Sequence, residues 1–349
     1  MKILHAADLH LDTAFTGHCE ADSSYLKKAL ATVPETIAAL CRQHGCDLLL
    51  LSGDLFDGPA TRESIDRLKQ ALQNVAIPTF ITPGNHDFCQ AGSPYLTETW
   101  PENVHIFTRP VMESVAIASL DCRVYGAGYT GMDCDPLLEN FRADGPEKWH
   151  IGILHGDPVQ RNTPYCPISQ AQVAASGLHY LALGHIHKAG QFTAGNTLCA
   201  WPGCPMGRGN DETGEKGVYL VTLDPHVAVE FLPLDTPRFY DLEAEVQTTA
   251  ADTLASLLPP AGSDDFYRIT LTGECAPLDH WDLSRYPHLE IRDRPVPPVD
   301  LWRCVGEDSL EGVYFKLLQD ALACGEEETV LLAAKISRRI LDGREVVLP

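Results

Sequence analysis

Five short polar segments of this chain carry carboxylates, imidazoles and one amide, which are side chains that bind divalent cations. In chain order they are Asp8-Leu9-His10, Gly53-Asp54, Gly84-Asn85-His86-Asp87, His155-Gly156 and Gly184-His185-Ile186-His187. Because a phosphodiester is already anionic, its hydrolysis benefits from two divalent cations about 3.5 to 4 Å apart that hold the phosphate oxygens and acidify a bridging water. These residue types in this order therefore predict phosphoester chemistry at a dinuclear metal centre.

The two cations would lie so close together that they need a shared charged ligand to offset their repulsion. Asp54 is the candidate for this bridge, because it follows the apolar run 48–51 and comes directly after Gly53. Neutral imidazoles and the Asn amide complete the two ligand sets without excess negative charge. Mixed nitrogen and oxygen donors favour Mn²⁺, Fe or Zn²⁺ over Mg²⁺. We expect two divalent ions, with Mn²⁺ as the first choice and Fe, Zn²⁺ or Mg²⁺ as alternatives.

Each polar segment comes just after an apolar stretch that predicts a β-strand. Open sheet proteins place their sites at the ends of neighbouring strands, so the polar segments are expected to gather at one edge. The apolar stretches are 3–6, 48–51, 80–81, 151–154 and 180–183.

Further motifs surround these segments and cover residues 1 to about 225. The chain opens with His5-Ala6-Ala7-Asp8-Leu9-His10-Leu11-Asp12, and a later run reads Gly53-Asp54-Leu55-Phe56-Asp57. Pro202-Gly203-Cys204-Pro205-Met206-Gly207-Arg208 is followed by Glu212-Thr213-Gly214-Glu215-Lys216-Gly217. Together with the five polar segments, these motifs resemble the calcineurin-like metallophosphoesterase superfamily and, within it, the DNA-repair branch of SbcD-type nuclease subunits.

The resemblance implies a ligand set for each metal ion and one residue without a metal. One ion would be held by Asp8, His10, Asp54 and His187. The other would be held by Asp54, Asn85, His155 and His185. His86 would touch the phosphate and help the leaving oxygen depart.

Several other polar residues have two interpretations. Arg208 either grips a phosphate bidentately or is a charge in a Gly-rich hairpin loop. Four carboxylates either orient ligand histidines or are solvated turn residues: Asp12, Asp57, Asp87 and Asp157. The remaining histidines are predicted to be surface or packed side chains: His5, His18, His44, His105, His150, His179, His226, His280 and His288.

Length and composition predict a cytoplasmic enzyme with an added module and no membrane attachment. With 349 residues, 44% of them hydrophobic, the chain can bury a large core and split into two domains or more. It starts directly with a predicted strand and shows no run long enough for a signal peptide or membrane helix. The 12 cysteines are scattered and form no Cys-x-x-Cys, which predicts reduced thiols in a reducing compartment.

The net charge of −22 opposes a DNA substrate, because 26 basic residues face 48 acidic ones. Nucleic-acid binding depends mainly on Lys and Arg side chains that neutralise phosphates. Three interpretations follow. Either a partner holds most of the DNA, or a local basic patch exists that the composition hides, or the substrate is a small phosphoester.

The pattern divides the chain into three regions. A catalytic domain at 1–234 ends in the linker Leu234-Asp235-Thr236-Pro237. Residues 238–293 then show a strand, helix, strand pattern with a last strand at 289–292. This resembles the small capping domain of SbcD-type proteins, which leans over the active site and helps select the substrate. Arg294-Pro295-Val296-Pro297-Pro298 is a stiff connector.

The region at 299–349 is predicted to be a helical tail. Apolar residues recur at helical spacing through 310–322. A second helix has Glu326 to Glu328 near its start, Arg338 and Arg339 near its end and Gly343 just beyond. In the resembling proteins such a tail binds the coiled-coil root of an SMC-like ATPase. The alternative is that the two helices pack on the chain's own capping domain.

These observations predict an α/β four-layer sandwich, two β-sheets flanked by helices, with a small α+β capping domain and a helical tail. The predicted function is a metal-dependent phosphodiesterase that acts on DNA. Such a protein would be the exonuclease subunit of a repair complex with an SMC-like ATPase, and a homodimer is compatible with it. Two alternatives remain open. One is a small-molecule or cyclic-nucleotide phosphoesterase, and the other is a catalytically quiet scaffold subunit.

Overall fold

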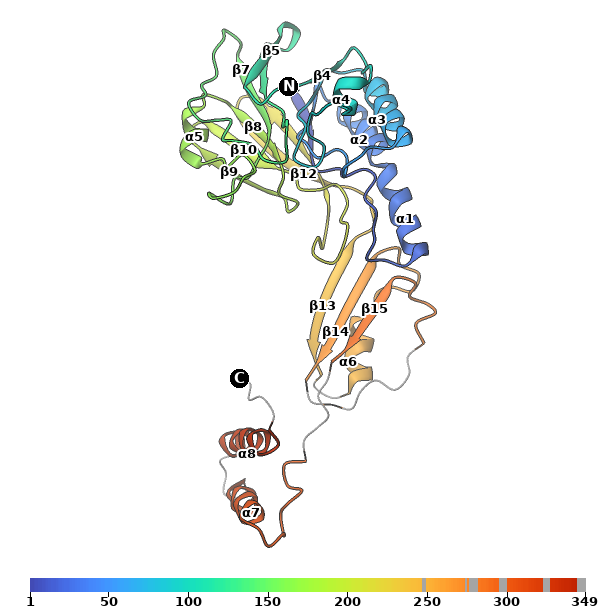
Figure 1. The fold of residues 1–349 in the computed structure, drawn as a ribbon, viewed down its shortest axis with the longest axis vertical. Coiled ribbons are helices and arrows are strands. Elements are labelled where there is room, and N and C mark those ends of the chain that lie inside the picture. Colours follow the sequence, from blue (N-terminus) through green and yellow to red (C-terminus); the bar gives the residue numbers. More distant parts are fainter. Residues whose placement is uncertain (247–248, 274, 276–281, 295–299, 323–326, 344–349) are drawn as a thin grey trace. The chain divides into compact units, whose positions relative to one another are not determined.

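The computed structural model divides the chain into two compact units (Figure 1). The first contains Met1–Asp241 and Asp264–Phe266, and the second contains Leu242–Ser263 and Tyr267–Pro349. The expected connector at 295–298 and the expected helix start at Glu326 lie outside the described residues. The structure describes residues 1–246, 249–273, 275, 282–294, 300–322 and 327–343.

The first unit contains a six-stranded sheet in the order β12-β11-β1-β2-β3-β4. Strands β1 to β4 are parallel to one another, whereas β11 runs antiparallel to β1 and to β12. Every residue of β2 is buried, as expected for a parallel strand that is covered on both faces. The strands are β1 (Lys2–Ala6), β2 (Leu48–Leu51), β3 (Thr79–Ile81), β4 (Val104–Ile106), β11 (Gly217–Leu223) and β12 (Val227–Pro233).

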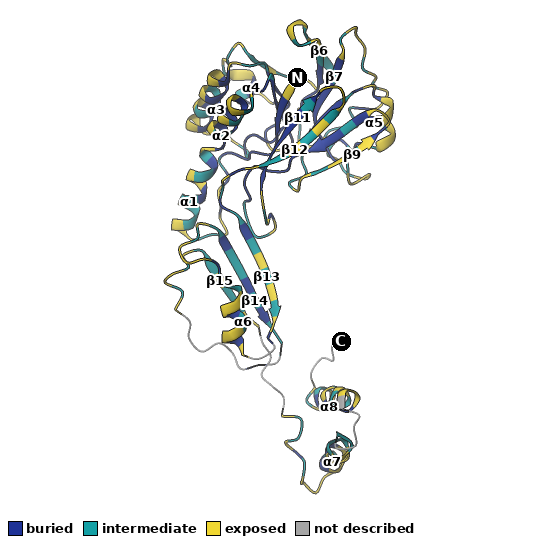
Figure 2. Cartoon of the chain, turned by 180° about the vertical axis from the view of Figure 1, so that it is seen from behind, coloured by how far each residue is buried: buried dark blue, intermediate teal, exposed yellow. Residues whose placement is uncertain are grey.

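A second six-stranded sheet has the order β5-β6-β7-β8-β10-β9. Its four central strands are mutually parallel, and an antiparallel strand closes each edge. Figure 2 shows β7, one of these central strands, largely in the colour of buried residues. The strands are β5 (Glu113–Ile117), β6 (Cys122–Gly126), β7 (Trp149–His155), β8 (Tyr180–Gly184), β9 (Gly190–Ala194) and β10 (Thr197–Trp201).

Helices cover the outer faces of both sheets, which gives four layers. Successive residues of β1 point to opposite faces, so Ile3 packs between the sheets while Leu4 packs under the helices. On the second sheet, Leu181 packs with Val173 of the outer helix. The predicted α/β four-layer sandwich is therefore confirmed. Its helices are α1 (Glu20–Ala31), α2 (Val33–His44), α3 (Arg62–Val75), α4 (Pro94–Thr97), α5 (Gln170–Ala175) and the 3₁₀ turn Ala118–Leu120.

A small three-stranded sheet follows in the order β13-β14-β15, together with one helix. Leu254 of the helix packs against Ile269 and Leu271 of the central strand. The strands and the helix occur where the sequence places them, while the domain boundaries at 234, 238 and 299 stay predictions. The elements are β13 (Phe239–Glu245), α6 (Ala250–Leu257), β14 (Phe266–Thr272) and β15 (Leu289–Asp293).

The last two helices, α7 (Leu310–Leu322) and α8 (Glu327–Leu341), pack on each other around Phe315. The guanidinium carbon of Arg338, a fully buried residue, lies 4.1 Å from the centre of the Phe315 ring. Arg338 also donates to Cys304 Sγ at 2.8 Å and pairs with Glu311. Among the described residues, no helix combines the length and the apolar character that a membrane crossing requires.

Candidate metal centre

The five polar segments meet where strands of the two sheets end. Asp8 and His10 follow β1, and Asp54 follows β2. His155 is the last residue of β7, one residue beyond the predicted strand. The two sheets are joined here by the backbone N–H of His185, which follows β8 and donates to Asp8 Oδ1 at 2.9 Å. All seven side chains that the sequence proposes as ligands therefore belong to one cluster.

The loops that carry these residues turn sharply after their strands. Asp8, His10, Asp54 and His185 all have positive φ angles, of 52°, 47°, 50° and 99°. Residues with a Cβ adopt this region rarely, and such strain is concentrated at functional sites. The turns are held by backbone bonds, for example from His10 N–H to the Asp54 carbonyl at 2.9 Å. Only glycine fits at position 84, because a Cβ atom there would collide with the Asp54 carboxylate.

The first donor group contains Asp8, His10 and His187, whose ligand atoms all lie within 4.8 Å of one another. The Nε2 atoms of His10 and His187 face each other at 3.1 Å. Asp54 Oδ2 lies 3.7 Å from His10 Nε2. Two imidazole nitrogens and two carboxylates converging in this way suit a divalent transition-metal ion.

The second donor group surrounds Asn85, the one amide of the set. Asn85 Oδ1 lies 3.0 Å from His155 Nε2 and 3.2 Å from His185 Nδ1. Asp54 Oδ2 lies 3.4 Å from His155 Nε2, and it therefore faces this group as well as the first. Asp54 is placed where a ligand shared by two ions would have to be.

The electrostatics of the centre favour cations. Asp8 and Asp54 are each only 1% exposed, and His10 and His155 are fully buried. Burial would raise the pKa of Asp54, but His155, His10 and His86 outweigh it and hold that pKa below its usual range. Burial would lower the pKa of His155, but Asp54 and Asp8 outweigh it and raise that pKa to about 9. Two buried carboxylates thus create a strongly negative potential, and the donor set fits two divalent cations.

His5 is a buried histidine whose hydrogen bonds connect strands that carry candidate ligands. His5 Nδ1 lies 2.8 Å from the Tyr180 hydroxyl, while its Nε2 lies 3.1 Å from the Leu183 carbonyl and 2.9 Å from Ser52 Oγ. Ser52 in turn offers its carbonyl to His155 Nδ1 at 3.0 Å. Burial lowers the pKa of His5 to about 3, so this imidazole stays neutral. His5 is the packed side chain that the sequence predicts, and it ties β1 to β8 beneath the metal centre.

His86 differs from the ligand candidates because 43% of its side chain is exposed. Its Nδ1 lies 3.0 Å from Asp57 Oδ1, and this hydrogen bond raises the pKa of His86. Its ring packs edge-on against His10, with the ring centres 4.8 Å apart. Asp57 Oδ1 also lies 3.7 Å from His10 Nδ1. The position of Asp57 is that of a carboxylate that orients histidines, one of its two predicted interpretations.

Asp12 and Asp87 hydrogen-bond to no histidine among the described residues, so neither has the histidine-orienting role that was one of its two predicted interpretations. Asp12 accepts from the Thr61 backbone N–H at 2.9 Å and from Ser64 Oγ at 2.7 Å, so it fixes the start of α3. Asp87 accepts from the backbone N–H of Leu55 and of Gly84, both at 2.7 Å. Asp87 is 7% exposed and holds together the loops that carry Asp54 and Asn85, so it is not placed to contact a phosphate.

Asp157 combines features of both predicted interpretations, a carboxylate that orients a ligand histidine and a turn residue. Its Oδ1 accepts from the backbone N–H groups of Val159 and Gln160 at 2.7 and 2.8 Å, and its Oδ2 lies 4.0 Å from His185 Nε2. It therefore orders the loop after β7 and faces a candidate ligand from beyond hydrogen-bond distance.

The sequence reasoning missed Glu212 as a functional residue. Glu212 Oε1 lies 2.6 Å from His187 Nδ1, on the side of the ring opposite the metal cluster. Arg208 Nη2 donates to the same oxygen at 2.8 Å, and the Arg208 backbone N–H donates to Glu212 Oε2 at 2.9 Å. Burial would raise the pKa of Glu212, but His187 and Arg208 hold it below its usual range. The signal was present, because Glu212 opens a motif only four residues after Arg208.

The family follows from residues 1–189, which match the calcineurin-like phosphoesterase family over more than half of the chain. The chain belongs to this family. The matched residues 1–189 include all seven candidate ligands, from Asp8 to His187.

Three proteins of known sequence are similar to this chain. The uncharacterized metallophosphoesterase YhaO of Bacillus subtilis is 33% identical over 277 residues, which cover 74% of this chain and 65% of that protein. The probable glycerophosphodiester phosphodiesterase GpdQ of Arcobacter nitrofigilis is 26% identical over 156 residues, 41% of this chain and 57% of that protein. The SbcD subunit of the nuclease SbcCD of Bacillus subtilis is 24% identical over 267 residues, 64% of this chain and 67% of that protein. The chain thus spans less than two thirds of the first two relatives.

Glu212→Gln is expected to weaken metal binding in this chain by about 10-fold to 100-fold, the usual cost of losing a carboxylate that orients a ligand histidine. The amide keeps the size of the side chain but removes the charge that fixes the His187 ring. Titration calorimetry with Mn²⁺ measures the effect. Asp211→Asn, an exposed carboxylate one residue earlier, is the matched control. Equal metal affinity in Glu212→Gln and wild type would show that the contact has no such role.

Proposed function

We propose that this chain is a dinuclear metal-dependent phosphodiesterase that cleaves DNA, the nuclease subunit of a DNA-repair complex. The observation that carries the proposal is the position of Asp54 Oδ2, 3.7 Å from His10 Nε2 in one donor group and 3.4 Å from His155 Nε2 in the other. Asp8, His10, Asp54 and His187 would hold one ion, and Asp54, Asn85, His155 and His185 the other. Two such ions, most simply Mn²⁺, supply an acidified water and a clamp on the phosphate oxygens.

His86 is proposed to act on the leaving group and not on the metals. Its Nδ1 is occupied by Asp57 at 3.0 Å, which leaves Nε2 to deliver a proton to the departing oxygen. Because Asp57 raises the pKa of His86, the protonated form that this step requires is favoured. The partial exposure of His86 allows it to meet a substrate that enters from solvent.

DNA is favoured over a small phosphoester as the substrate, because the similarity to the SbcCD nuclease subunit extends over more of the chain than the similarity to the glycerophosphodiester phosphodiesterase. The alignment with the SbcCD nuclease covers 267 residues, whereas the alignment with the glycerophosphodiester phosphodiesterase covers 156. The nuclease alignment is therefore longer than the 189-residue family match and must include sequence outside it. The small-molecule alternative is favoured by the net charge of −22. The scaffold alternative is opposed by the presence of all seven candidate ligands in one cluster.

Hydrolysis by the purified chain tests the proposal. With Mn²⁺ we expect cleavage of bis-p-nitrophenyl phosphate and of single-stranded or duplex DNA, and loss of both activities when EDTA is added. Cleavage of the chromogenic diester and of cyclic nucleotides without any cleavage of DNA would replace the nuclease by the small-molecule alternative. Absence of activity on every substrate with each of Mn²⁺, Zn²⁺, Fe²⁺ and Mg²⁺ would favour the scaffold.

The proposed partner is an SMC-like coiled-coil ATPase in the cytoplasm, bound through α7. Val313 and Leu317 of this helix are 56% and 64% exposed, although Phe315 between them is fully buried. Exposed apolar residues on one helix face, with a packed core on the other, are typical of a partner surface. The name of the SbcCD relative describes one subunit of a complex, which supports the same assignment.

Leu317→Glu is expected to abolish co-purification with such an ATPase, because it places a charge in the apolar face. Since Leu317 is exposed, the thermal unfolding of the chain should not change. Gln319→Glu adds the same charge elsewhere on α7 and should leave co-purification intact. Retention of the ATPase by Leu317→Glu would remove this face from the proposed interface.

A further inference from the structure

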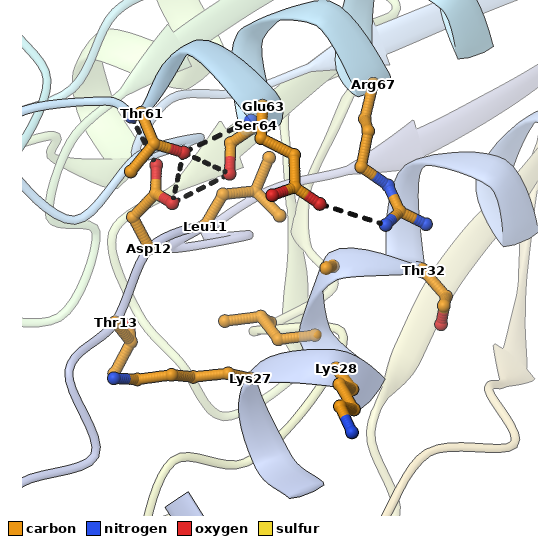
Figure 3. Close-up of a pocket in the computed structure, with 12 residues that line it drawn as sticks. Leu11, Asp12, Thr13, Lys27, Lys28, Thr32, Thr61, Glu63, Ser64 and Arg67 are labelled. Atoms are coloured by element: carbon orange, nitrogen blue, oxygen red, sulfur yellow. Dashed lines mark hydrogen bonds and ion pairs between the residues drawn. The ribbon is translucent and has the colours of Figure 1, made fainter. Parts of the chain in front are cut away.

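A cavity of about 580 Å³ lies beside the loop that leaves the metal centre (Figure 3). Its walls come from three elements of the first unit: the loop 11–13, the second half of α1 and the first turns of α3. Three cations line it, Lys27 and Lys28 from α1 and Arg67 from α3. Figure 3 shows the Lys27 side chain extended along the cavity toward Thr13.

The carboxylates of this cavity are already engaged. Asp12 accepts three hydrogen bonds at the start of α3, two from Thr61 and one from Ser64. Glu63 lies 3.8 Å from Arg67, which also pairs with Glu35 at 3.0 Å. Lys27 and Lys28, by contrast, have no carboxylate within ion-pair distance in the part of the chain that the structure describes. The cavity therefore presents uncompensated positive charge in a chain whose net charge is −22.

Not every cavity of the first unit carries such charge. A second cavity of about 520 Å³ is lined by His86, Asp87 and Glu98 among others, and no Lys or Arg contributes to it. Arg62 and Lys69, the cations nearest to Glu98, are both paired with that residue. An anion that extends from the metal centre is thus attracted toward Lys27 more than along the wall beside His86.

The short segment 10–13 connects the metal centre to the cavity, because it begins at the candidate ligand His10 and ends at Thr13, which lines the cavity. Thr13 follows the candidate ligand His10 by three residues, so their Cα atoms lie within about 11 Å of each other. Thr13 Oγ1 donates to the His10 carbonyl at 2.8 Å and to Asp57 Oδ2 at 3.0 Å. Along a B-form strand, whose axial rise is about 3.4 Å per nucleotide, this upper limit corresponds to at most about three nucleotides.

We propose that this cavity binds a backbone phosphate of a polynucleotide strand whose scissile phosphate lies at the metal centre, with Lys27 as the principal contact. The inference rests on the proposed function, and it names the substrate class as a polynucleotide longer than two nucleotides. The inference also explains how a chain with a net charge of −22 could bind DNA, because Lys27 and Lys28 make the cavity locally positive. Lys28, which also lines the cavity, adds to the attraction.

Binding of a labelled oligonucleotide tests the inference. The probe is a fluorescein-labelled single strand of about 12 nucleotides, a length within the usual size of single-strand binding sites. Its fluorescence anisotropy reports binding to the full chain. EDTA is present so that no cleavage occurs. Lys27→Glu is expected to weaken binding by about tenfold or more, as loss of a phosphate contact with added repulsion implies. The slope of log affinity against log salt should fall by about 0.7 for one lost contact.

Arg142→Glu is the matched control, since it makes the same charge change on a residue remote from the cavity. Its neighbour Ala143 bonds to Ser176, before the start of β8, whereas the metal ligands follow the end of that strand. Arg142→Glu should therefore bind the oligonucleotide as the wild type does. A loss equal to that of Lys27→Glu would mean that only the overall charge matters, and it would overturn the inference.

Two further outcomes bear on the inference. A labelled dinucleotide has one internucleotide phosphate, which would lie at the metal centre, and no further backbone phosphate for the cavity. Lys27→Glu should therefore not change its binding. A loss equal to that of the longer strand would mean that the cavity binds a nucleotide and not a strand, and it would overturn the inference. If the wild type binds no oligonucleotide, or if Lys27→Glu binds it normally, the inference fails. Hydrolysis of bis-p-nitrophenyl phosphate and of DNA by the wild type with Mn²⁺, measured separately, shows whether the proposed function itself stands.

Discussion

Asp54→Asn is expected to abolish diester hydrolysis and to leave the chain unable to hold two ions at once. Asp54 is the candidate ligand that faces both donor groups, and its second oxygen accepts from the His86 backbone N–H at 2.9 Å. Asparagine keeps an oxygen for that hydrogen bond but lacks the negative charge that offsets the repulsion between two cations. Because loss of an orienting residue alone costs about 10-fold to 100-fold in metal affinity, loss of the shared ligand should cost more.

Elemental analysis of the purified variant and a bis-p-nitrophenyl phosphate assay measure this result. Circular dichroism should show the same fold as the wild type, since Asn fills the same space. Asp133→Asn, at an exposed loop position, makes the same change of charge and should behave as the wild type. Near-normal turnover by Asp54→Asn would rule out the two-metal assignment.

The strands and the polar segments that follow them were predictable because both depend on short-range patterns. Parallel strands that are buried on both faces are continuous apolar runs, and β2 is such a run, with four buried leucines. A polar residue directly after such a run must lie at the carboxyl edge of the sheet, which is how Asp54 and His155 could be placed. The pairing of β11 with β1 could not be predicted, since more than 200 residues separate them and nothing in either strand specifies its neighbour.

The supporting residues were less predictable because their roles depend on loop conformation. Glu212 meets His187 across 25 residues, through a loop that no periodic pattern describes. Asp12 and Asp87 have the same residue type and similar positions after a ligand, yet they bond to a helix start and to two loop backbones. The basic cavity was hidden for a different reason. Composition averages over the surface, and Lys27 is prominent only where the paired carboxylates around it are known.

His86→Gln is expected to lower kcat for DNA cleavage by about 10²-fold to 10⁴-fold, the usual contribution of an acid or base, while both ions stay bound. Glutamine can still bond to Asp57, so the loop that holds Asn85 should keep its position. It has no proton to give at the pH of the assay, and the leaving oxygen would depart unassisted. Metal content by elemental analysis and kcat by steady-state kinetics give the two readouts.

The same variant separates a proton donor from a ligand. His86 lies close enough to His10 and Asp54 to form a possible third set of metal ligands, all within 4.8 Å. A ligand role would lower metal content together with kcat, whereas a donor role lowers kcat alone. His226→Gln, in the turn before β12, should change neither quantity. A leaving group that needs no proton, such as p-nitrophenolate, should lose less rate than a DNA strand, because the proton from His86 matters most for the poorer leaving group. Equal losses on both substrates, or loss of one ion, would show that His86 does not act as the donor.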